Sequence, residues 1–486
     1  MWAEPLKPSA EVFQQAVPPK RRRVSLSPSL SACSPATSVE QPSPNSTLSS
    51  GYMTIPSTPS EYGAIELHTP RTEENDPNES DDLALDLTHD IDFTIIAPKP
   101  RCALSHLSNL ETHYLQYHME LGSKLLANLE SDENPLRSLI IPRALSSPLL
   151  MKALCAVSAM HFANRSRDSL GAQTAAANYY VRTMSGLRSA LSNCPVEALS
   201  TDSVLAVALL CKYEIVRGSV KQWAVHLNAL EKLVVSRGGF STFDHETAEF
   251  LWGLFMYAHN VARVTNRKQI TNHVPGIETF SLTKLDIYIG YTEDIIKLCP
   301  RIADLPLLSH DPVALGLEIH TIDTLLRNWT YTSRQYIIPK GITDGSLLRL
   351  RMVAECFRDA AYIYLHSTLE RMSQSSMAHN LPSLWSSFIS RKKPVALRRC
   401  LDRIQSFHLD ENCEYSALTF PLFIAGCESE SPAERELVSQ SLGKLEMNFG
   451  IGNVKRAKEL LNILWSGEKM HWLDVLERLK WDLILA

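Results

Sequence analysis

The stretch DSVLAVALLCKYEIVR, residues 202–217, is apolar around nearly its whole circumference when it is drawn as a helix. A helix of this kind is buried among other helices, because it has no polar face to turn to water. Its longest uninterrupted apolar run, VLAVALLC at 204–211, is far shorter than the ~18 residues that a membrane-spanning helix needs. We therefore expect a helix in the middle of a helical array.

The segments on either side have the three- and four-residue spacing of amphipathic helices. Apolar residues recur from Leu107 to Leu129, and Asn134-Pro135 should end that helix. SSPLLMKALCAVSAMHFANRS at 146–166 has a serine at its cap and a proline in its first turn. Further helices are predicted near 176–191, 223–234, 246–265, 312–328, 347–372, 393–407, 432–447, 453–465 and 469–485. Because β alternation is nearly absent, we predict an all-α domain spanning residues 104–486.

Residues 1–100 have a different composition from the rest of the chain. They contain 14 of the 27 prolines and 14 serines. Proline blocks regular structure, and a segment with so little apolar surface cannot offset the entropy lost on ordering. We predict a disordered tail over residues 1–100.

A basic cluster, PPKRRRVS at 18–25, lies in this tail. Four cations would release few counterions and read no bases, so alone they would bind DNA only weakly. A solvent-exposed basic cluster beside a Pro-Pro pair suits a nuclear import receptor better. We predict an import signal, while a phosphate contact or a solvated tail remains open; its residues are Lys20, Arg21, Arg22 and Arg23.

Five Ser-Pro or Thr-Pro steps follow, and proline-directed kinases modify such steps. A phosphate there would add nearly two negative charges beside the basic cluster. Composition alone also produces this pattern in a Pro/Ser-rich tail, so both explanations stay open. The candidate phosphorylation sites are Ser27, Ser34, Ser43, Thr58 and Thr69.

The end of the tail, EENDPNESDDLALDLTHDIDFTII at 73–96, has nine acidic residues and no lysine or arginine. Acidic residues interspersed with apolar ones are typical of disordered activation segments, whose apolar residues stay available to a partner groove. An acidic linker, or a segment that docks on its own domain, explains the composition equally well. The candidate activation residues are Asp82, Leu83, Leu85, Asp86, Leu87, Asp90, Ile91, Asp92 and Phe93.

No motif has the spacing of a catalytic or metal site. HExxH, GxSxG and the Gly-Lys-Ser/Thr phosphate loop do not occur, and no two cysteines form CxxC. GIGNVK at 450–455 lacks the third glycine of a dinucleotide site, so a helix cap explains it better. His118, His161 and His226 have no second ligand at i+4, which favours packing roles. We predict no enzyme, no catalytic or metal-binding residues and no cofactor.

Three segments of the helical part resemble, in order, the fungal-specific transcription factor domain. This is the helical regulatory region behind the DNA-binding module of many fungal zinc-cluster activators. NPLRSLIIPRALSSPLLMKALCAVSAMHFANRS at 134–166 is similar to its opening. LLCKYEIVRGSVKQWAVHLNALEKLVVSRGG at 209–239 has its Tyr-Glu pair, Trp-x-x-His-Leu step and Gly-Gly end, although Asn228-Ala229 replaces the commoner Gly-Ala. FPLFIAGCES at 420–429 and GIGNVKRAKELLNILW at 450–465 are similar to its C-terminal signature.

The front of the chain departs from this family. Full members have a six-cysteine zinc cluster whose helix enters the major groove, but the first hundred residues here contain only Cys33. DNA-binding residues therefore stay unassigned. Two explanations remain open: a gene model that lacks a zinc-cluster exon, or a regulator that reaches DNA only through partners.

The resemblance implies a nuclear transcription regulator of a metabolic or secondary-metabolite biosynthetic gene set. Its expected partners are the transcription machinery or another transcription factor, with homo- or heterodimerisation common in the family and no membrane partner. The formal net charge of −5 agrees with this, because it excludes a generally basic, nucleic-acid-coating protein. The alternative is a helical ligand-binding or scaffold protein with no role at promoters. A helical enzyme of the terpene cyclase kind is disfavoured, because the one Asp-dense stretch lies in the tail.

Overall fold

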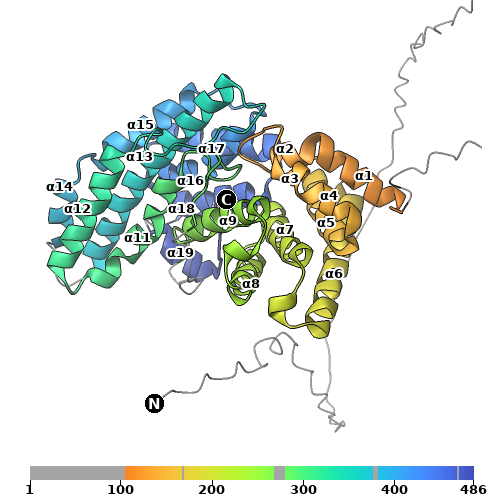
Figure 1. Ribbon diagram of the computed structural model, residues 1–486. Coiled ribbons are helices and arrows are strands. Elements are labelled where there is room, and N and C mark those ends of the chain that lie inside the picture. Colours follow the sequence, from red (N-terminus) through yellow and green to blue (C-terminus); the bar gives the residue numbers. More distant parts are fainter. Residues whose placement is uncertain are drawn as a thin grey trace, which may run out of the picture. The chain divides into compact units, whose positions relative to one another are not determined.

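The computed structural model describes residue 104 and residues 106–166, 169–266, 280–375, 381–467 and 470–485. The chain divides between residues 94 and 95 into two units, and all described residues belong to the second. This unit is a stack of helices (Figure 1). Among the described residues, the only β-type pairing is an isolated parallel bridge between Lys284 and Ile337. The predicted all-α fold is confirmed.

The first helix is shorter than its sequence pattern predicts. Helix α1 (Asn109–Tyr117) begins at a capping box formed by Ser108 and Glu111. It continues through a π turn, η2 (His118–Gly122), into α2 (Ser123–Leu125), and the chain then leaves the helix. Asn134-Pro135 does not end this helix but begins the next, α3 (Pro135–Ser138), because the Asn134 side chain accepts a hydrogen bond from Leu136 N. Asparagine at the cap and proline at the first position suit a helix start.

The middle of the fold is a series of long helices around the segment quoted first. They are α4 (Ile140–Ser146), α5 (Pro148–Arg165), α6 (Ser169–Asn193), α7 (Thr201–Arg217), α8 (Gln222–Ser236) and α9 (His245–Ala262), with short 3₁₀ turns η3 (Val196–Ala198) and η4 (Phe240–Thr242) between them. Every residue of α7 from Ser203 to Val216 is buried, as predicted. Helix α5 begins at the expected serine cap, where Ser147 accepts a hydrogen bond from Leu150 N.

The C-terminal half packs around the 32-residue helix α13 (Asp344–Ser375), which contacts α15 and α16. The other elements are α10 (Glu293–Ile296), α11 (Leu298–Asp304), η5 (Leu305–Leu308), α12 (Pro312–Asn328), α14 (Leu381–Phe388), α15 (Lys393–Ser406), η6 (Cys413–Leu418), α16 (Thr419–Glu428), α17 (Pro432–Phe449), α18 (Gly452–Ser466) and α19 (Trp472–Leu479). The predicted 469–485 helix is too long. Lys480 takes the left-handed conformation (φ 55°), and the chain returns along the body as an extended segment.

One continuous hydrophobic core joins both halves. Trp223, Trp252 and Trp472 are fully buried in it, and Trp465 and Trp481 are partly buried against it. Of the helices in the described ranges, none combines the length and apolar character that a membrane crossing requires.

Candidate functional site

The site residues predicted in the tail all precede residue 104 and lie outside the described residues. They are the import candidates Lys20, Arg21, Arg22 and Arg23, the activation candidates between Asp82 and Phe93, and the phosphorylation candidates Ser27, Ser34, Ser43, Thr58 and Thr69. The structure brings together two other features of the helical unit. One is a joint between the signature segments, and the other is a pocket.

The three signature segments meet at Asn164, which lies near the end of the first segment. We call this contact the signature joint. The side-chain amide of Asn164 donates to the carbonyl of Val216 at 2.7 Å and to the carbonyl of Gly450 at 2.8 Å. These carbonyls belong to the second and third signature segments. One turn earlier, His161 Nε2 lies 2.8 Å from the carbonyl of Phe449. Three segments far apart in sequence are therefore joined through one helix end.

Two glycines allow the backbones to meet at this joint. Gly218 ends α7 with a φ of 75°, and a Cβ built on it would lie 2.7 Å from the carbonyl oxygen of Gly452. A Cβ on Gly452 would lie 2.6 Å from Gly218 N. A side chain at either position would therefore push two backbones apart. Gly450, with a φ of 59°, ends α17, so the GIGNVK motif is a helix-to-helix turn, as predicted.

The Trp-x-x-His-Leu step fastens the end of the chain to the same region. The indole Nε1 of Trp223 donates to the carbonyl of Asp482 at 2.5 Å, and Asp482 N donates to the carbonyl of Val220 at 2.7 Å. His226, three residues after the tryptophan, lies with its Nε2 2.9 Å from the hydroxyl of Tyr180. Trp223 and His226 therefore hold α8 against the C-terminal segment and against α6, which makes their role structural.

The three helical histidines are buried and hydrogen-bonded, as the sequence predicts. His118 lies 3.1 Å from both the carbonyl of Leu136 and the hydroxyl of Ser158. Burial lowers the pKa of His118 and His226 to about 4 and that of His161 to about 3. Neutral rings of this kind serve packing, since none of the three can gain a proton near neutral pH.

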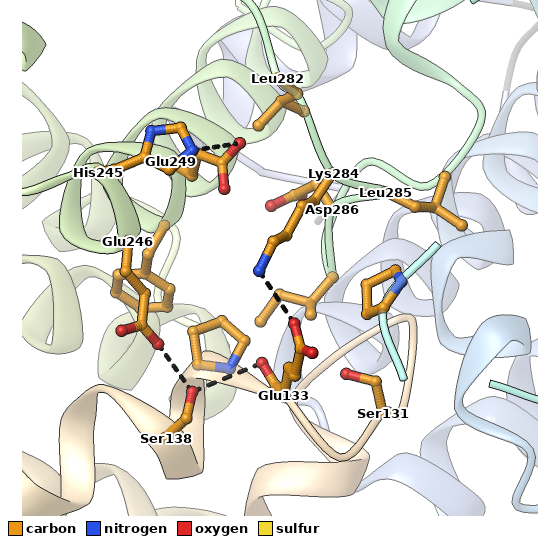
Figure 2. A pocket seen from close by; sticks show the side chains of 14 residues that line it. Ser131, Glu133, Ser138, His245, Glu246, Glu249, Leu282, Lys284, Leu285 and Asp286 are labelled. Atoms are coloured by element: carbon orange, nitrogen blue, oxygen red, sulfur yellow. Dashed lines mark hydrogen bonds and ion pairs between the residues drawn. The ribbon is translucent and has the colours of Figure 1, made fainter. Parts of the chain in front are cut away.

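A cavity of about 270 Å³ opens between the N-terminal turns of α9, the helix α3 and the extended segment 282–287 (Figure 2). We call it the acidic pocket. Apolar walls come from Phe250, Leu285 and their neighbours. Its charged or titratable lining residues are Glu133, His245, Glu246, Glu249, Lys284 and Asp286. Four carboxyl groups face one ammonium group, so the lining favours positive charge.

Segment 282–287 is held in place by backbone bonds on both of its ends. Leu285 N donates to the carbonyl of Ile337 at 3.0 Å, and Ile337 N donates to that of Thr283 at 2.9 Å. The carbonyl of Ile287 accepts a bond from Asn128 N at 2.7 Å. Lys284 and Asp286 both line the pocket, so this anchoring sets them along it.

The acids of α9 are positioned by its cap. Asp244 accepts a hydrogen bond from Thr247 N at 2.9 Å and forms an ion pair with Arg143 of α4 at 2.8 Å. Because residues three apart on a helix lie on one face, Glu246 and Glu249 both line the pocket. Glu249 is fixed further, since it accepts hydrogen bonds from Thr283 N at 3.0 Å and Thr283 Oγ1 at 2.6 Å.

Lys284 reaches across the pocket opening to Glu133, with Nζ 2.9 Å from Oε2 (Figure 2). The hydrogen bond between the two side chains raises the pKa of Lys284 and lowers the pKa of Glu133, and the charge of Lys284 adds to the second effect. On the opposite side, Glu246 accepts a hydrogen bond from the hydroxyl of Ser138 at 2.8 Å. The opening is therefore bordered by half-exposed polar groups that already make short contacts.

Asp286 is the most buried acid of the pocket, with 8% of its surface exposed. Its Oδ1 accepts hydrogen bonds from Tyr288 N and Ile289 N, both at 2.8 Å. Burial raises the pKa of this carboxyl to about 7, although the two N–H groups oppose the rise. A Cβ on Gly253 would lie 2.3 Å from Oδ2, so the absence of a side chain on α9 makes room for the carboxyl group.

Sequence reasoning missed this pocket because its acids come from three separate segments without a motif. The usable signal was Gly253 inside the apolar run of α9, since a glycine within a helix marks a close approach. No group of three or more His, Cys, Asp or Glu side chains in the described part of the chain is arranged to hold a metal ion.

The comparisons with known proteins assign the helical unit. The family model described as "Fungal specific transcription factor domain" matches residues 113–486, well over half of the chain. The chain belongs to this family, and the resemblance seen in the sequence is confirmed. No curated protein and no solved structure matches it. Membership supports a role as a transcription regulator, and the family implies a nuclear protein without enzymatic activity.

Proposed function

We propose that this protein regulates a metabolic or secondary-metabolite biosynthetic gene set from within the nucleus, and that it acts through protein contacts. The observation that supports this is the family match over residues 113–486. The buried joint at Asn164 adds to it, because it gives the three signature segments a common structural role. A stable helical body of this kind can present surfaces to partners without any catalytic group.

The tail supplies the remaining functions in this proposal. Lys20, Arg21, Arg22 and Arg23 direct nuclear import, and the acidic segment around Asp82–Phe93 recruits the transcription machinery. Phosphorylation at the Ser-Pro and Thr-Pro steps would add negative charge near the basic cluster and weaken its attraction for an import receptor. Dimerisation with a second copy, or with another transcription factor, belongs to the same proposal.

Contact with DNA needs a separate source, because the first hundred residues contain only Cys33. It comes either from a partner or from a zinc-cluster exon upstream of the printed sequence. Sequencing the 5′ end of the transcript separates these cases. In-frame exons with two cysteine triplets would make the protein a direct DNA binder, and a transcript that begins at Met1 would turn the search to its partner.

The function itself is tested by deleting the gene and measuring all transcripts in the source organism. We expect a coherent set of metabolic genes to change, and a copy with Lys20, Arg21, Arg22 and Arg23 replaced by alanine to remain cytoplasmic and fail to restore it. A wild-type copy is the control. Unchanged transcripts, or full rescue by the cytoplasmic variant, would favour the scaffold alternative.

A further inference from the structure

The acidic pocket has no part in the proposed regulation through protein contacts. We infer that it binds a small organic cation, an amine or guanidinium group attached to a short apolar chain. The argument starts from Asp286. Its Oδ1 takes two backbone hydrogen bonds, whereas Oδ2 has no hydrogen-bond partner among the residues that the structure describes. The Asp286 side chain is more than nine-tenths buried, and Oδ2 keeps some access to solvent. An acceptor on such a side chain normally has a partner.

The position of this oxygen points to a ligand. Asp286 lines the cavity, and Gly253 leaves space for its carboxyl group where any other residue would collide with it. A buried carboxylate is costly unless a positive charge or a hydrogen-bond donor faces it. A cation entering the pocket would supply both, because an ammonium or guanidinium group donates several hydrogen bonds.

The charges at the opening agree with this assignment. Lys284 is the resident cation, but it pairs with Glu133 at the rim and is 45% exposed. The nearby charges of Glu249 and Glu246 also raise the pKa of Lys284, in keeping with the excess of carboxyl groups around it. The pocket is lined by four carboxyl groups and one ammonium group, so the charge of its side chains can accommodate a second cation.

The shape and walls select an organic cation over a metal ion. Carboxylates that bind a divalent metal converge on one point, and no such group occurs in the described ranges. Here the acids are spread around about 270 Å³, and the space between them is lined by Phe250, Leu282 and Ile287. Apolar walls with a few charged groups are typical of small-molecule sites, and they fit the carbon chain of the cation.

Binding is tested on the purified 486-residue chain by calorimetry and thermal shift, with butylamine and butylguanidine as probes and 1-butanol as the neutral isostere. Ionic strength is held constant with sodium chloride. We expect saturable binding of at least one cation and none of the alcohol. Absence of saturable binding by either cation, or equal binding of the alcohol, would overturn the inference. These measurements do not depend on transcription, so their failure is distinguishable from failure of the proposed function.

The inference predicts that some variants of the pocket bind the cation more weakly and that one binds it more tightly. Asp286→Asn should weaken binding by about thirtyfold or more, as loss of a buried charge partner does. At the rim, Glu246→Gln should weaken it by about two- to fivefold, whereas Lys284→Ala should strengthen it, because a competing cation is removed. Glu459→Gln, which loses an acid paired with Arg456 on α18, is the matched control and should bind like the wild type.

The rim variants keep the test decisive if Asp286→Asn does not fold, since Glu246 and Lys284 are exposed or half-exposed. Far-ultraviolet circular dichroism confirms the fold of each variant before titration. Equal affinities for the wild type, Glu246→Gln and Lys284→Ala would show that the acids of the pocket do not hold the cation, and the inference would be wrong.

Discussion

At the scale of single residues, the buried carboxyl group of Asp286 is costly to ionise. Its pKa is raised to about 7, mainly by burial, from an ordinary value of 3.8. A raised acid pKa means that the folded state holds its proton more tightly than the unfolded state. The stabilisation is therefore fully present below pH ~4 and is lost as the pH rises through 7. Glu249 of α9 and Glu293 of α10 act on the same carboxyl group and raise its pKa further.

Asp286→Asn tests this cost. The amide oxygen can still accept the hydrogen bonds from Tyr288 N and Ile289 N, but it never ionises. The unfolding free energy of the variant, relative to wild type, should rise by up to about 4 kcal/mol between pH 4 and pH 8. Urea unfolding at several pH values measures it. Asp402→Asn, on the exposed face of α15, is the control, and an equal rise in that variant would contradict the explanation.

A second residue-scale prediction concerns Asn164, whose amide donates to the carbonyls of Val216 and Gly450. Asn164→Ala removes both bonds and should lower the unfolding free energy by about 1 to 3 kcal/mol. Asn178→Ala, on the exposed side of α6, removes an asparagine that makes no such bridge. Thermal unfolding should separate the two variants. Equal midpoints would mean that the signature joint contributes little to stability.

At the scale of helices, the close approach of α7 and α18 depends on Gly218 and Gly452. Gly218→Ala places a Cβ against the Gly452 carbonyl and forces alanine into the left-handed region. We expect a loss of unfolding free energy of at least about 2 kcal/mol, since the conformational term alone costs about 1 to 2 kcal/mol. The measurement is chemical unfolding followed by tryptophan fluorescence.

Gly171→Ala is the matched control for that prediction. Gly171 lies in α6, and a Cβ there would meet nothing within 4 Å. Alanine in a helix is favoured over glycine by about 0.5 to 1 kcal/mol, so this variant should be as stable as the wild type or more stable. If Gly218→Ala lowers the unfolding free energy and Gly171→Ala does not, the loss of stability is due to the α7–α18 contact.

At the scale of the whole molecule, the returning C-terminal segment closes the fold. Leu483, Ile484 and Leu485 are fully buried, and Trp223 binds the carbonyl of Asp482. Removing residues 481–486 would delete these three buried side chains, each contributing about 1.5 to 3 kcal/mol, and would uncover the apolar surface that they now cover. This sum approaches the total stability of a domain, so we expect an aggregating or partly unfolded protein, detected by dye binding and analytical gel filtration.

Asp482→Ala is the control for the truncation, because it keeps the backbone contacts with Trp223 and Val220 and removes a side chain whose contacts include a 3.3 Å hydrogen bond from Asn266. This variant should unfold at a temperature close to that of the wild type. If the truncated chain is equally stable and monomeric, the segment is an appendage and the fold closes without it.

The sequence predicted the helices whose start and burial are fixed by residues within the helix itself. Helices α5 and α7 follow from a serine cap and from an apolar run, and both causes lie within the segment itself. The stop after Leu125 and the turn at Lys480 were missed, because the apolar pattern continues past both points. Beyond both points the chain forms contacts with distant residues, such as the hydrogen bond from Asp482 N to the carbonyl of Val220. Periodicity reports burial, and burial does not require a helix.

The amino-acid sequence by itself determined the helical class of the protein, its family and its signature segments, because caps, helical periodicity and signature residues act over a few positions. Only the tertiary structure decided where those segments meet and which acids share a pocket. Asp286, Glu249 and Glu133 come from three segments with no fixed spacing. Their proximity follows from the packing of α9 against segment 282–287, and a pairwise distance in space is not encoded by any local pattern.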